Sequence, residues 1–184
     1  MLFVFIICLF AFLDQLIKYL ITVNIPYGDT IEVIEGFFYL THHKNPGASF
    51  SFLADQSWGI YVLSAFSIIL FIAMIYFLYA YQKKASFLLL FIVSVLAAGN
   101  LGNLIDRVRL KGVIDYLMFD FGIFVFPVFN LADSCVVVAA IGLLLLVLLD
   151  KPLFPSDKVN KDKGADEHEE SEDANIDDKH EESQ

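Results

Sequence analysis

Four long apolar segments decide which folds this chain can adopt. They cover residues 2–23, 58–81, 87–105 and 126–149. An α-helix rises 1.5 Å per residue, so roughly 20 residues cross the ~30 Å hydrocarbon core of a bilayer. The chain is also 58% hydrophobic, against about 45–50% in soluble domains. The sequence therefore predicts a mainly α membrane protein, a four-helix transmembrane bundle.

The first segment differs from a cleaved signal peptide. It has no basic residues before its apolar run, and it continues past Asp14 without a small-residue cleavage site. We expect it to be retained as a span. Cys8 and Cys135 both lie in apolar runs and show no metal-ligand spacing, so we expect neither a disulfide nor a metal site from them.

Lysine positions indicate the orientation in the membrane. Lys83, Lys84 and Lys151 border the spans on one side, which predicts that this side and both termini are cytoplasmic. Loops 24–57 and 108–125 then lie outside, although a basic cluster (Arg107, Arg109 and Lys111) on the outer side departs from the trend.

The regions outside the spans differ in character. The first outer loop has three β-prone runs, at residues 30–34, 37–41 and 48–52, which predict a small extracytoplasmic β-sheet. Residues 155–184 hold 12 of the 22 acidic residues but only 4 of the 12 basic ones. We therefore divide the chain into a membrane domain, 1–154, and a disordered acidic tail, 155–184.

Polar residues inside the spans are the strongest indication of function. A charged group at the centre of a span costs about 2.5–3.5 kcal/mol on insertion scales, so such groups usually face the protein interior and mark a site. The residues concerned are Asp14 and Lys18 in the first span, Asn100, Asn103, Asp106 and Arg107 in the third, and Asn130 and Asp133 in the fourth. Counting 1.5 Å per residue from the ends of the spans places all of them near the outer face, which indicates a site that opens outward.

Several of these residues also have a purely structural interpretation. Asp14 and Lys18 are four residues apart and can form an ion pair on one helix face. Asp106 can cap the end of its helix, and the asparagines can form hydrogen bonds between helices. Asp133 has no basic neighbour in its span; with Asp115 on the nearby loop it could form a carboxyl pair that shares one proton and activates water.

Other chemistries are less well supported. His42 and His43 are adjacent on an expected strand and so point in opposite directions, and no histidine has metal-ligand spacing. Ser64, Ser67 and Ser94 have no base nearby in sequence, which favours a packing role. A transporter would need polar access from both sides of the membrane, and a scaffold would need neither Asp115 nor Asp133.

Five sequence blocks, in order, closely resemble the lipoprotein signal peptidases (signal peptidase II). They are Asp14-Gln15-x-x-Lys18, Asn45-Pro46-Gly47-Ala48-Ser49-Phe50, Gly99-x-x-Gly102-Asn103-Leu104-Ile105-Asp106-Arg107, Val113-Ile114-Asp115-Tyr116 and Phe129-Asn130-Leu131-Ala132-Asp133-Ser134. The resemblance implies a bacterial inner-membrane endopeptidase that cuts prolipoproteins before a diacylglyceryl-modified cysteine. It implies an aspartate pair, Asp115 and Asp133, with no metal and no cofactor.

The same resemblance implies supporting residues and partners. Positions matching substrate-binding or positioning residues are Asn103, Arg107, Asn130, Asn45, Gly99, Asp14 and Lys18. The implied fold adds an outer β-cradle and a short loop helix over the site. The expected partners are prolipoproteins and membrane lipid, with no nucleic acid, and we expect a monomer. Ser49, Asn100 and Tyr116 depart mildly from the family pattern, and none of them replaces an implied catalytic group.

Overall fold

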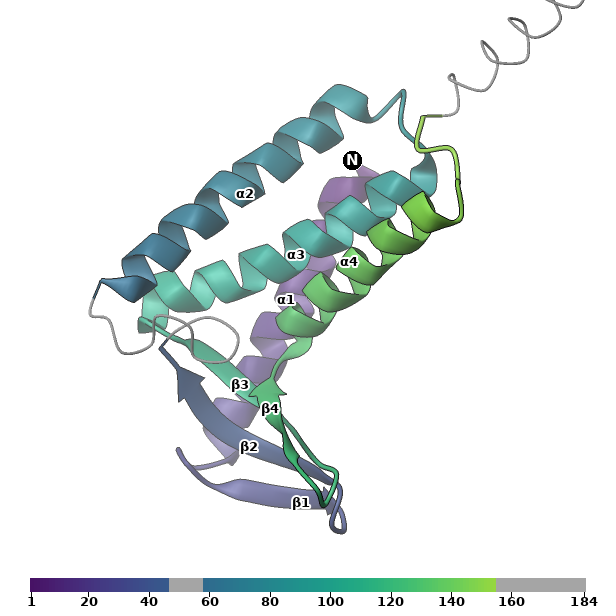
Figure 1. Ribbon diagram of the computed structural model, residues 1–184. Coiled ribbons are helices and arrows are strands. Elements are labelled where there is room, and N and C mark those ends of the chain that lie inside the picture. The colour runs from purple at the N-terminus through teal and green to yellow at the C-terminus, as the bar shows by residue number, and fades with distance from the viewer. Residues whose placement is uncertain (47–57, 155–184) are drawn as a thin grey trace, which may run out of the picture.

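Four helices form the bundle in the computed structural model, which describes residues 1–46 and 58–154 (Figure 1). They are α1 (Leu2–Asn24), α2 (Gly59–Tyr81), α3 (Phe87–Leu110) and α4 (Leu131–Leu148). Each is long and apolar enough to cross a membrane, as predicted from the sequence.

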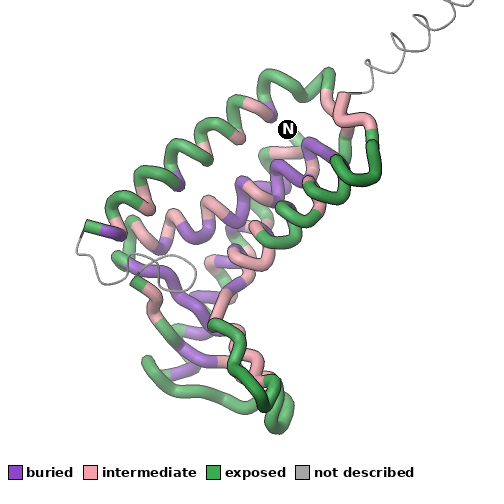
Figure 2. The backbone as a smooth tube through the Cα atoms, in the orientation of Figure 1, coloured by how far each residue is buried: buried purple, intermediate pink, exposed green. Residues whose placement is uncertain are grey.

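Helix α3 is the centre of the bundle. It contributes the largest share of buried side chains, whereas α2 buries only Gly59, Ser67 and Leu78. Figure 2 shows the contrast between the largely exposed α2 and the buried α3. Apolar residues of α1, α3 and α4 form the main core, so α1 and α4 are held tightly on α3 while α2 lies at the edge.

An antiparallel sheet lies at one end of the bundle. Its strands are β1 (Thr30–Ile34), β2 (Phe38–Asn45), β3 (Val113–Asp120) and β4 (Val125–Phe129), in that spatial order. The first two strands were predicted from the sequence, with the second extending further than expected. The third β-prone run, 48–52, lies outside the described residues, and the part of the chain that is described contains no short loop helix.

Strands β3 and β4 correct two predicted span boundaries. Residues 126–129 belong to β4 and not to the fourth span, which begins as a helix only at Leu131. The third span does not end at Ile105: helix α3 continues to Leu110 and ends at Lys111, whose φ of 57° is left-handed. Apolar residues stand on both sides of the junction between β4 and α4, and only Asn130 and Asp133 mark it in the sequence. Pro127 is tolerated because β4 is an edge strand.

The sheet runs crosswise to the helices and meets the bundle where α1 and α3 end and α4 begins (Figure 1). Strand β3 starts three residues after the end of α3, and β4 ends two residues before the start of α4. The start of β3, the end of β2 and the first turn of α4 therefore come together where the polar residues lie.

Candidate active site

Asp115 and Asp133 come from different elements and share one asparagine. Asn130 donates from Nδ2 to Asp115 Oδ1 (2.7 Å), and its backbone N–H donates to Asp133 Oδ2 (3.3 Å). Asn130 and Asp115 are 0% and 3% exposed. The structure thus brings together the two carboxyl groups that the sequence separates by 18 positions.

The position of Asp133 follows from the start of helix α4. Asn130 is the N-cap, and its Oδ1 accepts from the backbone N–H of Asp133 (2.8 Å), which completes a capping box with Asp133 at the third helical position. A carboxylate in the first turn is stabilised by the helix dipole. Local helix-capping chemistry therefore fixes the Asp133 side chain.

Two further backbone N–H groups at the start of α4 bond to distant elements. The N–H of Leu131 donates to the Tyr116 hydroxyl (3.1 Å), and that of Ala132 donates to Asp14 Oδ1 (3.0 Å). Helix-start N–H groups have no partner within their own helix. Strand β3 and helix α1 supply these partners, so the start of α4 is held from both sides.

Asn103 links Asp133 to a buried charge cluster. Its Nδ2 donates to Asp133 Oδ1 (2.8 Å), while its Oδ1 accepts from Lys18 Nζ (3.0 Å) and from Asn130 Nδ2 (3.2 Å). Because an ammonium group can only donate, Lys18 requires the oxygen of Asn103 to face it. The amide nitrogen of Asn103 is therefore the end that faces Asp133.

Lys18 forms two ion pairs within the membrane bundle. Its Nζ lies 2.8 Å from Asp14 Oδ2, as the spacing of four residues predicted, and 2.8 Å from Asp106 Oδ2. The interpretation of Asp106 as a simple helix cap was wrong: it pairs with Lys18 and accepts from the backbone N–H of Ile114 (3.2 Å). All three charged side chains are buried, so the cluster joins α1 to α3 and to the start of β3.

Gln15 has a role that its place in the motif beside Asp14 does not predict. Its Nε2 donates to Asp106 Oδ1 (3.0 Å) and to the carbonyl oxygen of Gly102 (3.1 Å), with a longer contact to Asp14 Oδ2 (3.4 Å). Its neighbour Asp14 is the only signal for it in the sequence, because its two shorter bonds go to residues on α3, 87 and 91 positions away. Gln15 satisfies the second oxygen of Asp106, which leaves that carboxylate fully paired.

Asn45, at the end of β2, approaches the other side of Asp115. Its Nδ2 donates to Asp115 Oδ2 (3.2 Å), and β2 pairs His43 opposite Asp115 in the sheet. Burial, followed by the nearby charge of Asp133, raises the pKa of Asp115 to about 7 despite the hydrogen bonds from Asn45 and Asn130. Asp115 can therefore hold a proton near neutral pH.

Glycines allow the close helix approach on which the site depends. A Cβ at Gly99 would lie 2.5 Å from the carbonyl oxygen of Ala132, and one at Gly102 would lie 2.6 Å from Asp14 Oδ2. The structure thus places Gly99 at the contact between α3 and α4. A larger residue there would push the first turn of α4, with Asp133, away from α3.

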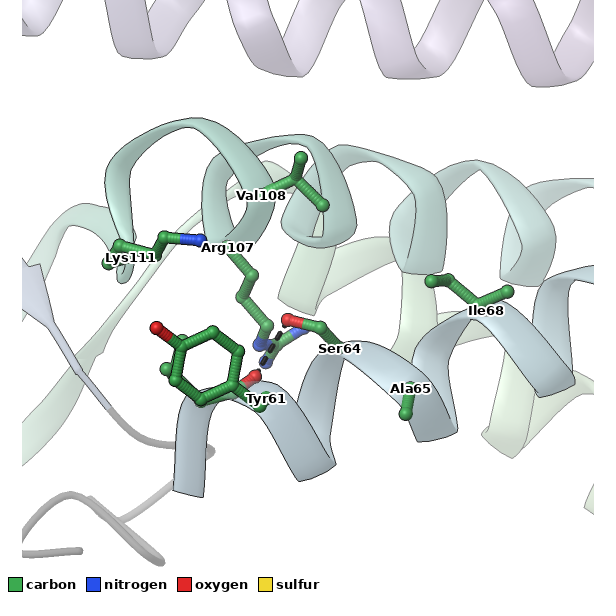
Figure 3. A pocket seen from close by; sticks show the side chains of 8 residues that line it. Tyr61, Ser64, Ala65, Ile68, Arg107, Val108 and Lys111 are labelled. Atoms are coloured by element: carbon green, nitrogen blue, oxygen red, sulfur yellow. Dashed lines mark hydrogen bonds between the residues drawn. The ribbon is translucent and has the colours of Figure 1, made fainter. Parts of the chain in front are cut away.

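Arg107 extends from α3 toward α2 (Figure 3). Its Nη1 donates to Ser67 Oγ (3.4 Å), while its buried Nε has no hydrogen-bond partner among the described residues. The guanidinium borders a cavity of about 230 Å³ between α2 and α3. The cavity is lined by Ile60, Tyr61, Ser64, Ala65, Ile68, Arg107, Val108 and Lys111.

Other polar residues of the spans have structural roles. Asn100 donates to the carbonyl oxygen of Ser67 (2.7 Å), an interhelical bond of the kind expected. Ser64 and Ser94 donate to carbonyl groups one turn earlier in their own helices. Within residues 1–46 and 58–154 no group of three or more His, Cys, Asp or Glu is arranged to hold a metal ion.

Four membrane-length helices with a buried polar cluster at one end of the bundle are typical of an integral membrane protein with a functional site. A family model described as "Signal peptidase (SPase) II" matches residues 6–149. The chain is 40% identical to a lipoprotein signal peptidase of Bacillus pumilus over 75% of its own length and 86% of that protein. With the lipoprotein signal peptidase of Enterococcus faecalis the identity is 42%, over 76% and 83% of the two chains.

Solved structures give the same result. A bacterial membrane enzyme determined by the in meso method at 1.9 Å resolution superposes with a TM-score of 0.70 and 33% identity, over 81% of this chain and 94% of that one. A second, at 2.3 Å resolution, gives a TM-score of 0.71 and 33% identity over 80% and 88%. The chain belongs to the signal peptidase II family. It is therefore a protease, and its four apolar helices make it a multi-pass protein of the bacterial inner membrane.

Proposed function

We propose that this protein removes signal peptides from diacylglyceryl-modified prolipoproteins, cleaving before the lipidated cysteine with Asp115 and Asp133 as an aspartate pair. The observation that carries the proposal is the placement of two carboxyl groups, the buried Asp115 and the half-buried Asp133, on one asparagine, Asn130. Two nearby carboxyl groups in a poorly solvated setting cannot both ionise cheaply, so they share one proton. The kinship with lipoprotein signal peptidases supports the choice of substrate.

The surroundings of the two carboxyl groups suggest which takes which role. Each accepts two hydrogen bonds, but Asp133 lies in the first turn of α4, where the helix dipole favours its ionised form. The pKa of Asp115 is raised to about 7, which favours its protonated form. Asp133 is then the general base and Asp115 the general acid.

The proton transfers balance over two steps. Asp133 removes a proton from water as the oxygen attacks the scissile carbonyl carbon, while Asp115 protonates the carbonyl oxygen. The tetrahedral diol then collapses as the C–N bond breaks. The leaving nitrogen takes the proton held by Asp133, and Asp115 regains its own from a hydroxyl group of the diol. No metal or cofactor enters either step.

The edge position of α2 supports binding of a lipidated substrate. The cavity beside Arg107 lies between α2 and α3. A second, apolar cavity of about 340 Å³ lies further along the same two helices, and Leu70, Phe77 and Leu96 form part of its lining. Acyl chains fit apolar walls of this kind. The Nε of Arg107, which has no partner within residues 1–46 and 58–154, is a donor suited to a carbonyl oxygen of the bound substrate.

The remaining parts of the proposal concern the orientation of the protein in the membrane and its oligomeric state. We place both termini in the cytoplasm and the sheet at the outer face, on the lysine distribution, with the enzyme acting as a monomer. The substrate keeps its acyl chains in the outer leaflet, so a site at the sheet end of the bundle meets the adjacent peptide bond. The open edges of the sheet are suited to binding an extended peptide backbone.

Cleavage of a fluorogenic diacylglyceryl lipopeptide by the purified protein in detergent tests the proposal. Asp115→Asn and Asp133→Asn each keep the size of the side chain but remove the base or the acid, and each should lower the rate at least about a hundredfold. The double variant should lose little more, because the two groups act as a unit. An excess of chelator should leave the rate of the native chain unchanged.

Asp29→Asn is the matched control, since Asp29 is an exposed carboxylate in the same outer region. Within residues 1–46 and 58–154 its backbone forms hydrogen bonds but its side chain forms none. Its rate should equal that of the native chain. Near-normal cleavage by a folded Asp133→Asn protein would refute the aspartate pair, and failure of the native chain to cleave the lipidated peptide would refute the substrate.

A further inference from the structure

The two hairpin turns of the sheet expose a cluster of apolar side chains at the end furthest from Asp115. The turns are residues 35–37 and 121–124, and we call their apolar residues, Phe37, Phe121, Ile123 and Phe124, the apolar tip. Ile123 is 91% exposed, and the phenylalanines are 39–52% exposed. Figure 2 shows this end of the sheet as continuously exposed.

The apolar tip is one preformed surface. The ring of Phe37 lies 5.6 Å from that of Phe121, which lies 5.1 Å from that of Phe124, so the two turns are joined by aromatic contacts. Gly122 has a φ of +77°, and its N–H donates to Asp120 Oδ1 (2.8 Å). The backbone of the turn is thus fixed in a conformation that presents Ile123 outward.

The position of the tip relative to the bundle suggests what covers it. Asp115 and Asp120 are five residues apart on β3, which places the tip roughly 16 Å or more from the active site at ~3.3 Å per residue. The sheet runs crosswise to the helices (Figure 1). With the helices crossing the bilayer, as proposed above, this distance lies largely along the membrane surface. Strand β4 returns from the tip directly to Asn130, the N-cap of the membrane helix α4.

Exposed apolar side chains lie on both sides of the polar start of α4. Residues 121–127 are all exposed, and further along α4 the exposed side chains are again apolar, as at Val137 and Val138. Large exposed apolar patches mark interaction or membrane-binding sites, and Phe and aliphatic side chains hold interfacial segments at the boundary between headgroups and acyl chains. We propose that the apolar tip inserts into the outer leaflet of the lipid bilayer and holds the sheet against the membrane.

The charges near the tip define the kind of lipid interaction. Glu32, Glu35 and Asp120 are the charged residues within 30–39 and 117–129, and neither stretch contains lysine or arginine. Binding therefore depends on apolar burial and not on attraction to anionic headgroups, which the three carboxylates repel. The tip inserts into zwitterionic bilayers at least as well as into anionic ones.

Depth-dependent fluorescence quenching tests this insertion in the full-length chain. In a Cys8→Ser, Cys135→Ser background, Ile123→Cys is labelled with an environment-sensitive fluorophore and reconstituted into phosphatidylcholine vesicles containing lipid with a nitroxide at carbon 5 of an acyl chain. Glu32→Cys, at an exposed carboxylate of β1, is the aqueous control, and Val138→Cys, on the exposed side of α4, is the membrane control.

The expected result is quenching at position 123 at least twofold stronger than at position 32, and no stronger when anionic phosphatidylglycerol is added. Phe124→Cys provides a second labelling site, and an unchanged thermal midpoint in detergent shows that each labelled protein is folded. Quenching at 123 and 124 no greater than at 32 would overturn the proposal. Self-quenching that grows with protein density would also overturn it, in favour of a second copy of the chain as the occupant.

Discussion

The ammonium group of Lys18 donates to Oδ1 of Asn103 over 3.0 Å, and this contact determines which end of the Asn103 amide faces Asp133. A residue on α1 thereby orients a hydrogen bond to the α4 carboxylate through a side chain on α3. The charge cluster around Lys18 has two effects: it neutralises Asp14 and Asp106, and it orients an amide beside the proposed catalytic pair.

Lys18→Met should be more harmful than Asp14→Asn. Removing Lys18 leaves two buried carboxylates unpaired, and breaking a buried pair by removing one partner costs about 3–5 kcal/mol. Asp14→Asn leaves Lys18 with Asp106, so its effect should be smaller and should fall on stability more than on the cleavage rate. Thermal unfolding in detergent, measured beside lipopeptide cleavage, gives both quantities.

Comparing the stability and cleavage rate of the two variants shows whether the charge cluster stabilises the bundle and orients Asn103. If Lys18→Met protein is as stable as the native chain and cleaves normally, the cluster neither stabilises the bundle nor orients Asn103. Adding Asp106→Asn to Lys18→Met should recover part of the lost stability, because it removes one of the two unpaired charges.

The cleavage rate should fall as the pH rises through about 7. The pKa of Asp115 is raised to about 7 by burial and by Asp133, and the proposed mechanism requires Asp115 in its protonated form. The value of kcat/KM, which reports the ionisation of the substrate-free enzyme, should therefore decline up to tenfold per pH unit above that value. A rate that stays constant from pH 6 to pH 9 would contradict the assignment of Asp115 as the acid.

The same raised pKa predicts an effect on stability. Between pH 4 and pH 7 the folded state holds a proton on Asp115 that the unfolded state has lost, so the stability of the native chain falls as the pH rises across this range. Asp115→Asn removes this dependence. Its thermal midpoint relative to the native chain should be higher at pH 8 than at pH 5, and an equal difference at both pH values would contradict the prediction.

Asn130→Ser should separate helix capping from support of the carboxyl pair. Serine is also a good N-cap, so the first turn of α4 should be retained, but serine cannot provide the Nδ2 donor to Asp115. We expect a thermal midpoint within a few degrees of the native value and a cleavage rate at least about tenfold lower. Asn130→Ala, which loses both functions, should lower both; equal cleavage by the serine variant and the native chain would exclude a role for the donor.

Gly99→Ala and Gly142→Ala form a matched pair on the contact between α3 and α4. At Gly99 a Cβ would meet the carbonyl oxygen of Ala132 at 2.5 Å, which the backbone cannot avoid without moving α4. At Gly142 it would meet the flexible Cδ1 of Ile92 at 3.1 Å. Thermal stability and cleavage should fall for Gly99→Ala and change little for Gly142→Ala, and similar values for both would show that the close approach is unimportant.

Local sequence patterns predicted the features that depend on residues close together in the chain. The four spans follow from apolar length, and the pair of Asp14 and Lys18 follows from a spacing of four residues. The partnership of Lys18 with Asp106 could not be predicted, because it depends on how closely α1 approaches α3. That approach is set by Gly102 and by packing along the whole interface.

Strands β3 and β4 were not predicted from the sequence, for a different reason. Residues 125–129 read as Val-Phe-Pro-Val-Phe, so no alternation separates this strand from the apolar helix that follows. The available signal was Asn130 with Asp133 three positions later, a spacing typical of a helix start. The proposed aspartate pair depended on the resemblance to a family as well as on the residues, because nothing local joins Asp115 to Asp133.

The sheet combines strands from two connections, since β1 and β2 lie between α1 and α2 whereas β3 and β4 lie between α3 and α4. A chain synthesised from its N-terminus acquires the first pair of strands long before the second. Asp115 follows α3 and Asp133 lies in the first turn of α4, so the proposed aspartate pair cannot assemble before the last helix has been made. On the proposed mechanism a nascent chain that ends before α4 is inert, and cleavage begins only after the fourth helix has joined the bundle.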